Sequence, residues 1–306
     1  MAERQGLAVV RLASGTVSWQ VASEAFLRRD IAPTTRRIYA LTLDGVGRGL
    51  GGLPLAEMAP ADLEQAVMAA YAEVAPATWN RVVATVRSFV AYAARMRWVE
   101  ADLAAGLERR RVIEDHDRAL SREQVERILT RRESPVRDRA LWRLLYETAA
   151  RANEVLRLNV EDVDLQARRA VTTRKGGDRD ILHFQTGSAR LLPKVIEGRT
   201  HGPLFLSSRP AGPDRAVALG DVCPETGRHR LSYRRAADAF AHASGGRTLH
   251  QLRHSAITDL AEAGVPLPLL MAKSRHESLR TLQRYARPSV AAVAALTAEH
   301  DPARRR

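Results

Sequence analysis

The first third of the chain places apolar residues at helical spacing between turn signals. Hydrophobic positions recur every three or four residues over 18–29, from 34 to the glycines at 45–52, over 59–74 and from 76 onward. Pro33 is expected to break the chain, with Thr34 as the N-cap of the second helix. We therefore predict a small all-α bundle at residues 18–110, preceded by an N-terminal tail at 1–17.

A charged segment without a clean apolar face follows the bundle. It runs from Leu107 to His116 (LERRRVIEDH) and is interpreted as the start of the linker between two domains, with the linker itself placed at 111–118. Beyond it, Ser121 and Gln124 form the pattern of a capping box, which predicts the start of a helix. Residues 135–150 read as a strongly apolar helix.

The hydrophobic period changes once, near residues 170–184. Residues 170–173 and 180–184 resemble short strands around the Gly176-Gly177 turn, and they are the only hairpin that the pattern indicates. Helices are expected at 186–196, 231–243 and 248–263, with an irregular stretch at 207–225. The predicted fold is mainly α: a helical bundle, then a mixed α/β domain at 119–306 with a small β-hairpin sheet.

Charge changes this picture because it is uneven. The 306 residues carry a net charge of +13, and residues 111–306 hold 35 of the 48 basic side chains against 24 of the 35 acidic ones. A field of that sign attracts a polyanion such as nucleic acid, although a basic surface kept for solubility is the alternative.

Several classes of protein are disfavoured. Cys223 is the one cysteine, which rules out an intramolecular disulfide framework and a cysteine-rich zinc site. No apolar run approaches the length of a membrane span, and the apolar stretch at 7–10 is too short for a secretory signal. Neither a P-loop nor an HExxH motif occurs. We expect a cytoplasmic, nucleoid-associated protein with no membrane partner.

One candidate cluster lies in the helix predicted at 248–263. His250 and Arg253 are i,i+3 neighbours on one face, so an imidazole and a guanidinium can reach the same oxyanion. His254 gives half of a metal site with His250, but no third ligand is evident, and packing beneath the helix is the simpler interpretation for His254.

Three further clusters hold groups suited to chemistry. Arg151 stands where a helix starts, with Glu154 in its first turn, although a solvated side chain is the usual role of an arginine at such a position. Lys175 lies at the hairpin tip, and a lysine can act as a general acid where an arginine cannot, although a solvated turn lysine is the alternative. His276 precedes Tyr285 by nine residues, and Tyr285 stands among arginines, a poor setting for burial.

In this order and spacing, the clusters resemble the tyrosine recombinases, or phage-integrase family, in their two-domain, Xer-like form. The resemblance implies six catalytic residues, which are Arg151, Lys175, His250, Arg253, His276 and Tyr285. It also implies that residues 18–110 are a SAM-like core-binding domain and that 119–306 are a catalytic domain of the DNA breaking-rejoining fold.

The resemblance implies strand exchange by transesterification. Tyr285 would attack the scissile phosphorus to give a 3′-phosphotyrosine, Arg151 and Arg253 would stabilise the charge, and His250 would serve as base or proton shuttle. Lys175 would protonate the leaving 5′-oxygen and His276 would hydrogen-bond the phosphate. No ATP, metal or other cofactor is expected. The expected partner is double-stranded DNA, bound by a homotetramer.

The sequence departs from the family's motifs at two places, and two other functions remain possible. Ser274-Arg275 replaces the Leu-Gly that often precedes the second histidine, and Arg174 replaces a glycine beside the lysine. A type IB topoisomerase-like nickase and a catalytically silent DNA-binding protein remain alternatives. The DNA site and the biological role are left open, as is whether the apolar helix expected at 288–300 docks on its own or a neighbouring subunit. The few residues before 18 favour a recombinase that acts on short core sites.

Overall fold

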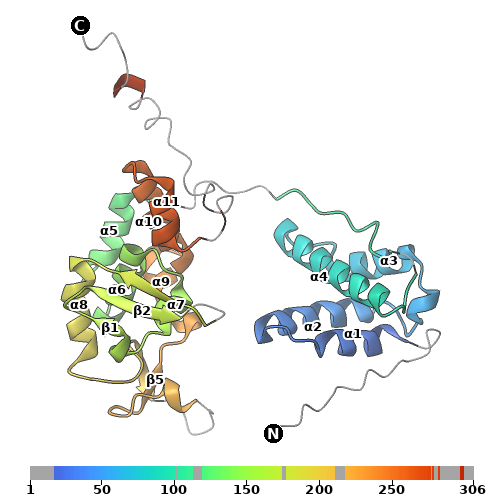
Figure 1. The fold of residues 1–306 in the computed structure, drawn as a ribbon, viewed down its shortest axis with the longest axis horizontal. Coiled ribbons are helices and arrows are strands. Elements are labelled where there is room, and N and C mark those ends of the chain that lie inside the picture. The colour runs from blue at the N-terminus through green and yellow to red at the C-terminus, as the bar shows by residue number, and fades with distance from the viewer. Residues whose placement is uncertain are drawn as a thin grey trace. The chain divides into compact units, whose positions relative to one another are not determined.

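The chain divides into two compact units, Met1–Glu114 and Asp115–Arg306 (Figure 1). Each unit has its own hydrophobic core. The structure is a computed structural model that describes residues 17–100, 102–112, 119–173, 177–210, 218–276, 278, 282 and 297–299. Within these ranges, no helix is both long and apolar enough to cross a membrane.

The first unit is the helical bundle that the pattern predicts. Aromatic side chains fill its centre: the Trp19 and Phe89 rings lie 4.5 Å apart, and Phe26 meets Phe89 edge-on. Its elements are α1 (Trp19–Leu27), α2 (Pro33–Gly47), the 3-10 turn η2 (Leu55–Glu57), α3 (Pro60–Tyr71) and α4 (Pro76–Arg95).

The start of α2 differs from the prediction. Pro33 begins this helix instead of breaking the chain before it, Ala32 is the N-cap, and Thr34 lies inside the helix. The reason is that proline lacks an N–H group that would have no partner at the first helical position, and its fixed φ suits a helix.

The end of α2 also differs, because Gly45 and Gly47 continue the helix instead of ending it. A Cβ on Gly47 would lie 2.8 Å from Cδ1 of Trp19, and one on Gly45 would collide with the hydroxyl of Tyr71. Close packing therefore explains these two glycines better than a turn does.

The charged segment after α4 belongs in part to the first unit, so the interpretation of Leu107 as the start of a linker was wrong. Leu107 is buried in the core of this unit, and Trp79 donates its indole N–H to the carbonyl of Glu108 (2.8 Å). The Arg110 guanidinium lies 4.0 Å from the centroid of the Trp79 ring and donates to the carbonyl of Ala72. Of the linker placed at 111–118, residues 113–118 lie outside the described residues.

The second unit is mainly helical with two small antiparallel sheets, which confirms the predicted fold class. Its helices are α5 (Arg122–Thr130), α6 (Val136–Thr148), α7 (Ala152–Leu156), α8 (Thr186–Ile196), α9 (Tyr233–Ser244), α10 (Leu249–Glu262) and α11 (Leu267–Ser274). Its strands are β1 (Val163–Asp164), β2 (Arg169–Thr173), β3 (Arg179–His183), β4 (Leu206–Pro210) and β5 (Arg228–Arg230), with 3-10 turns at Val160–Asp162 and Leu219–Asp221.

Helix α6 lies at the centre of this unit and packs against α8, α10, α5, α7 and α9. Leu141, Trp142, Leu144 and Leu145 are all buried, as the apolar run at 135–150 predicts. The helix ends at Thr148, and its C-cap Ala149, with a φ of 49°, turns the chain sharply toward Arg151. The capping box predicted at Ser121 and Gln124 is present at the start of α5.

The sheets confirm one prediction and correct another. The predicted hairpin is β2–β3, with Ala170 opposite Leu182 and β1 added at the edge of β2. The stretch at 207–225, expected to be irregular, overlaps β4, which pairs with β5 around a register shift. The pattern missed this sheet because β5 has only three residues and neither β4 nor β5 contains a buried residue, so neither strand shows an apolar alternation.

Candidate active site

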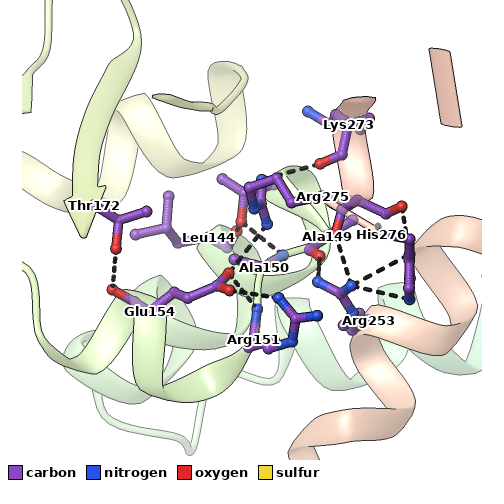
Figure 2. A network of polar contacts seen from close by, with 12 residues as sticks. Leu144, Ala149, Ala150, Arg151, Glu154, Thr172, Arg253, Lys273, Arg275 and His276 are labelled. Atoms are coloured by element: carbon purple, nitrogen blue, oxygen red, sulfur yellow. Dashed lines mark hydrogen bonds and ion pairs between the residues drawn. The ribbon is translucent and has the colours of Figure 1, made fainter. Parts of the chain in front are cut away.

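Three chain segments far apart in sequence meet at one end of α6, and Figure 2 shows the predicted site residues Arg151, Arg253 and His276 side by side there. Arg151 follows the left-handed turn after α6 and is the N-cap of α7. His250 and Arg253 lie in α10, and His276 follows α11 directly. The structure therefore brings Arg151, His250, Arg253 and His276 together.

Arg253 is almost fully buried, with 1% of its surface exposed. Its Nη1 donates to the carbonyl of Ala149 (2.6 Å) and its Nη2 to the carbonyl of Ser274 (2.7 Å). The same Nη2 lies 3.2 Å from Nε2 of His276. Arg253 therefore ties the end of α6 to the end of α11 and places a fixed positive charge between them.

Hydrogen bonding defines the tautomer of His276. The Ser274 hydroxyl donates its single hydrogen to the carbonyl of Leu270 (2.6 Å), so it accepts one from Nδ1 of His276, also at 2.6 Å. Nε2 is then the acceptor that faces Arg253. Burial, followed by the charges of Arg253 and Arg151, lowers the pKa of His276 to about 4, so the ring is neutral at pH 7.

Glu154 holds Arg151 in place. Its Oε1 accepts from Nη1 of Arg151 and its Oε2 accepts from the backbone N–H of Arg151, both at 2.9 Å. Burial alone would raise the pKa of Glu154, but the hydrogen bonds from Arg151 and the charge of Arg275 outweigh burial and lower it. The Arg151 side chain stays about half exposed, at 52%, so its charge is accessible to a ligand.

Arg275 and Lys273 are two basic groups at this site that the sequence did not single out as functional. Arg275 pairs with Glu154 at 3.3 Å, and burial lowers its pKa against the opposing charge of Glu154. Lys273 donates to the carbonyl of His183 (2.9 Å), and its pKa is lowered by burial and then by Arg275. The available signal for Arg275 was its departure from the glycine expected before the second histidine.

His250 is exposed, as Arg151 is, whereas Arg253 and His276 are buried. Its charge is among those that lower the pKa of His276, which places it at the same site. The His250 and His254 rings lie 6.5 Å apart, centroid to centroid. No group of three His, Cys, Asp or Glu side chains in the described ranges could hold a metal ion.

Lys175 and Tyr285 lie outside the described residues, as does nearly all of the segment expected to be a helix at 288–300. The strands that flank Lys175, β2 and β3, are in place. Among the described tyrosines, Tyr146 is the one bonded to a carboxylate near the end of α6: it donates to Asp259, and burial and then this bond raise its pKa to about 12. A phenol held in that way is a poor nucleophile at neutral pH.

The described part of the site is a concentration of positive charge. Arg151, Arg253 and Arg275 converge, and each lowers the pKa of His276. Two of these guanidiniums are buried and fixed by hydrogen bonds. Such preorganised donors stabilise an oxyanion, and a phosphate group is the ligand that guanidiniums match best.

Comparison with known proteins identifies the family. The model of the phage integrase family matches residues 118–291, and the chain belongs to that family. The tyrosine recombinase XerC of Mycobacterium leprae is 30% identical over 88% of this chain and 92% of its own. XerD of the same organism is 32% identical over 52% of this chain and 50% of its own.

Solved structures share the fold at low identity. A lambda integrase dimer (residues 75–356) bound to a core site superposes with a TM-score of 0.70 at 16% identity, over 90% of this chain and 97% of that one. The Tn1549 transposon integrase in complex with circular-intermediate DNA gives 0.68 at 15% identity, over 92% and 99%. These likenesses show that the fold is that of the integrases.

Proposed function

We propose that this protein is a site-specific DNA recombinase that cuts and rejoins strands through a 3′-phosphotyrosine on Tyr285. The observation that carries this proposal is the convergence of Arg151, Arg253 and His276 from three separate segments. Membership of the phage integrase family and similarity to XerC over nearly the full chain support it.

The reaction needs no change in the number of phosphoester bonds. The Tyr285 oxygen attacks phosphorus, the bond from phosphorus to the 5′-oxygen breaks, and Lys175 gives that oxygen a proton. His250 accepts the phenol proton, directly or through water. A 5′-hydroxyl of the partner strand then reverses these steps and releases Tyr285.

Arg151 and Arg253 stabilise the charge that builds on the non-bridging oxygens. Each such preorganised donor contributes about 10²–10³ in rate. Burial and then positive charges lower the pKa of His276, and a bound phosphodiester offsets the part that is due to the charges. His276 can then take up a proton at Nε2 and donate it in a hydrogen bond to the phosphate, in place of accepting a hydrogen bond from Arg253.

The substrate of this proposal is double-stranded DNA. Residues 18–110 serve as the core-binding domain and 119–306 as the catalytic domain, and most of the net positive charge lies in the second part. Four copies of the chain assemble on two sites; the related lambda integrase has been solved as a tetramer on a Holliday junction. The protein works in the cytoplasm on the nucleoid.

The experiment is to recover DNA that becomes covalently attached to the protein in cells and to sequence it. Two copies of the recovered site are then tested for strand exchange with purified protein. Exchange between the copies supports a recombinase. Relaxation of supercoils without exchange would indicate a nickase, and DNA binding with no covalent product would indicate a silent DNA-binding protein.

A further inference from the structure

Arg275 stands where the backbone favours glycine. It caps α11 in the left-handed region, with φ 56° and ψ 42°, a conformation in which a side chain meets steric cost and glycine does not. A large charged residue at such a position calls for a compensating interaction of its side chain.

The Arg275 side chain is turned inward rather than to solvent, with only 4% of it exposed. Nη2 donates to Oε2 of Glu154 (3.3 Å) and Nη1 donates to the carbonyl of Lys273 (2.9 Å). Asp180 on β3 is a second anion near enough to act on the guanidinium. Because a buried charge is costly unless paired, the contact with Glu154 is what makes this placement tolerable.

Glu154 is shared between two arginines that approach it from different segments (Figure 2). Oε1 accepts from Arg151, and Oε2 accepts from Arg275 as well as from the Arg151 backbone. If Glu154 were paired with Arg151 alone, its carboxylate would orient the Arg151 side chain but would also cancel most of the positive charge of Arg151. Sharing with Arg275 keeps the orientation and leaves more of the Arg151 charge for a phosphate.

We propose that Arg275 is a positioning residue for the strand-cleavage reaction: it shares the Glu154 carboxylate and so keeps Arg151 both oriented and positively charged toward the scissile phosphate. This inference rests on the proposed function and deepens it. It also accounts for an arginine at a backbone position that suits glycine.

The test measures the rate of covalent complex formation at saturating protein, on the DNA site recovered from cells, together with the melting temperature of each variant. Arg275→Gln keeps the backbone strain and removes the charge, and we expect a rate about tenfold lower. Arg275→Lys keeps the charge and recovers most of that loss. Equal rates for wild type, Arg275→Gln and Arg275→Lys would overturn the inference.

Arg275→Gly separates positioning from folding. It relieves the left-handed strain, so we expect a melting temperature equal to or above that of the wild type while the rate falls as in Arg275→Gln. This variant also gives the rate measurement if Arg275→Gln does not fold. The matched control is Arg97→Gly, since Arg97 is an exposed arginine with φ 58°, and it should leave the rate unchanged.

A double-mutant cycle tests the route through Glu154. In the Glu154→Gln background, Arg275→Gln should cost much less rate than it does in the wild type, and an equal cost in both would overturn the inference. If the wild type forms the covalent complex at the same rate as all Arg275 variants, this inference alone fails. If the wild type forms none with any DNA, the proposed function fails and takes this inference with it.

Discussion

The two arginines of the proposed phosphate clamp have different structural duties, although their chemistry is the same. Arg253 is buried and joins the carbonyls of Ala149 and Ser274, whereas half of the Arg151 side chain is exposed and held by Glu154 alone. Substitution at the two positions should therefore separate catalysis from stability.

We expect Arg151→Ala and Arg253→Ala each to slow covalent complex formation by about 10²–10³. Only Arg253→Ala should also lower the free energy of unfolding clearly, by about 1–3 kcal/mol, because it leaves buried carbonyls without a donor. Single-turnover assays and denaturant titrations of both variants check this. Equal losses of stability in both would contradict the different duties assigned here.

His276 links this site to pH. Its pKa is about 4 in the folded protein, below the ordinary 6.5, so the unfolded chain binds a proton that the folded protein does not. The free energy of unfolding should therefore fall as the pH drops from about 6.5 toward about 4. Above pH 6.5 the contribution of the neutral His276 ring to stability should be fully present. The melting temperature of His276→Gln should depend less on pH across that range. An unchanged pH profile in this variant would show that the ring is not held neutral.

At the scale of the element, helix boundaries followed packing where the pattern suggested turns. Gly45 and Gly47 looked like helix terminators, but both lie inside α2. They are glycines because the side chains of Tyr71 and Trp19 leave no room for a Cβ at these positions. A single sequence does not reveal which aromatic ring lies against which glycine, so this part of the fold could not be predicted from it.

Gly47→Ala should destabilise the first unit by about 1–3 kcal/mol, because the added methyl group meets the Trp19 indole. That sign is opposite to the gain expected from helix propensity alone. The indole cannot easily yield, since it donates to the carbonyl of Leu43. Gly220→Ala, which has open space around it, is the control for thermal unfolding. A stabilised Gly47→Ala would disprove the close contact.

The helices and the hairpin with strong periodic patterns were predictable from the sequence. The β4–β5 sheet and the contact between Arg275 and Glu154 were not. The apolar run of α6 and the capping box of α5 were visible in the sequence because their signals are local. The β4–β5 sheet and the sharing of Glu154 by Arg275 arise from contacts across 20 to more than 100 residues, as the separations of 22 for Ser207 with His229 and 121 for Arg275 with Glu154 show. The order of residues along the chain was enough to suggest which residues form the site. The pairing of the charges within the site could be seen only in the structure.

At the scale of the whole molecule, the chain is two units with separate cores. Trp19, Phe26 and Phe89 belong to one core, and Trp142, Phe205 and Phe240 to the other. This division fits the two domains that the proposed function assigns, one for core binding and one for catalysis.

A fragment spanning residues 17–112 should therefore fold on its own, since Leu107 and Arg110 complete its core and its surface. Calorimetry of the full chain should show two transitions, one of which matches the fragment. A fragment ending at residue 106 should melt lower, because it lacks Leu107. One shared transition, with an unfolded fragment, would contradict the independence of the two units.

In the proposed reaction, Tyr285 becomes covalently joined to DNA. The most direct measurement is mass spectrometry of the covalent complex after nuclease and protease digestion. We predict a nucleotide adduct on the peptide that contains Tyr285, and no adduct with Tyr285→Phe. An adduct on any other residue, or one that persists in Tyr285→Phe, would contradict the account.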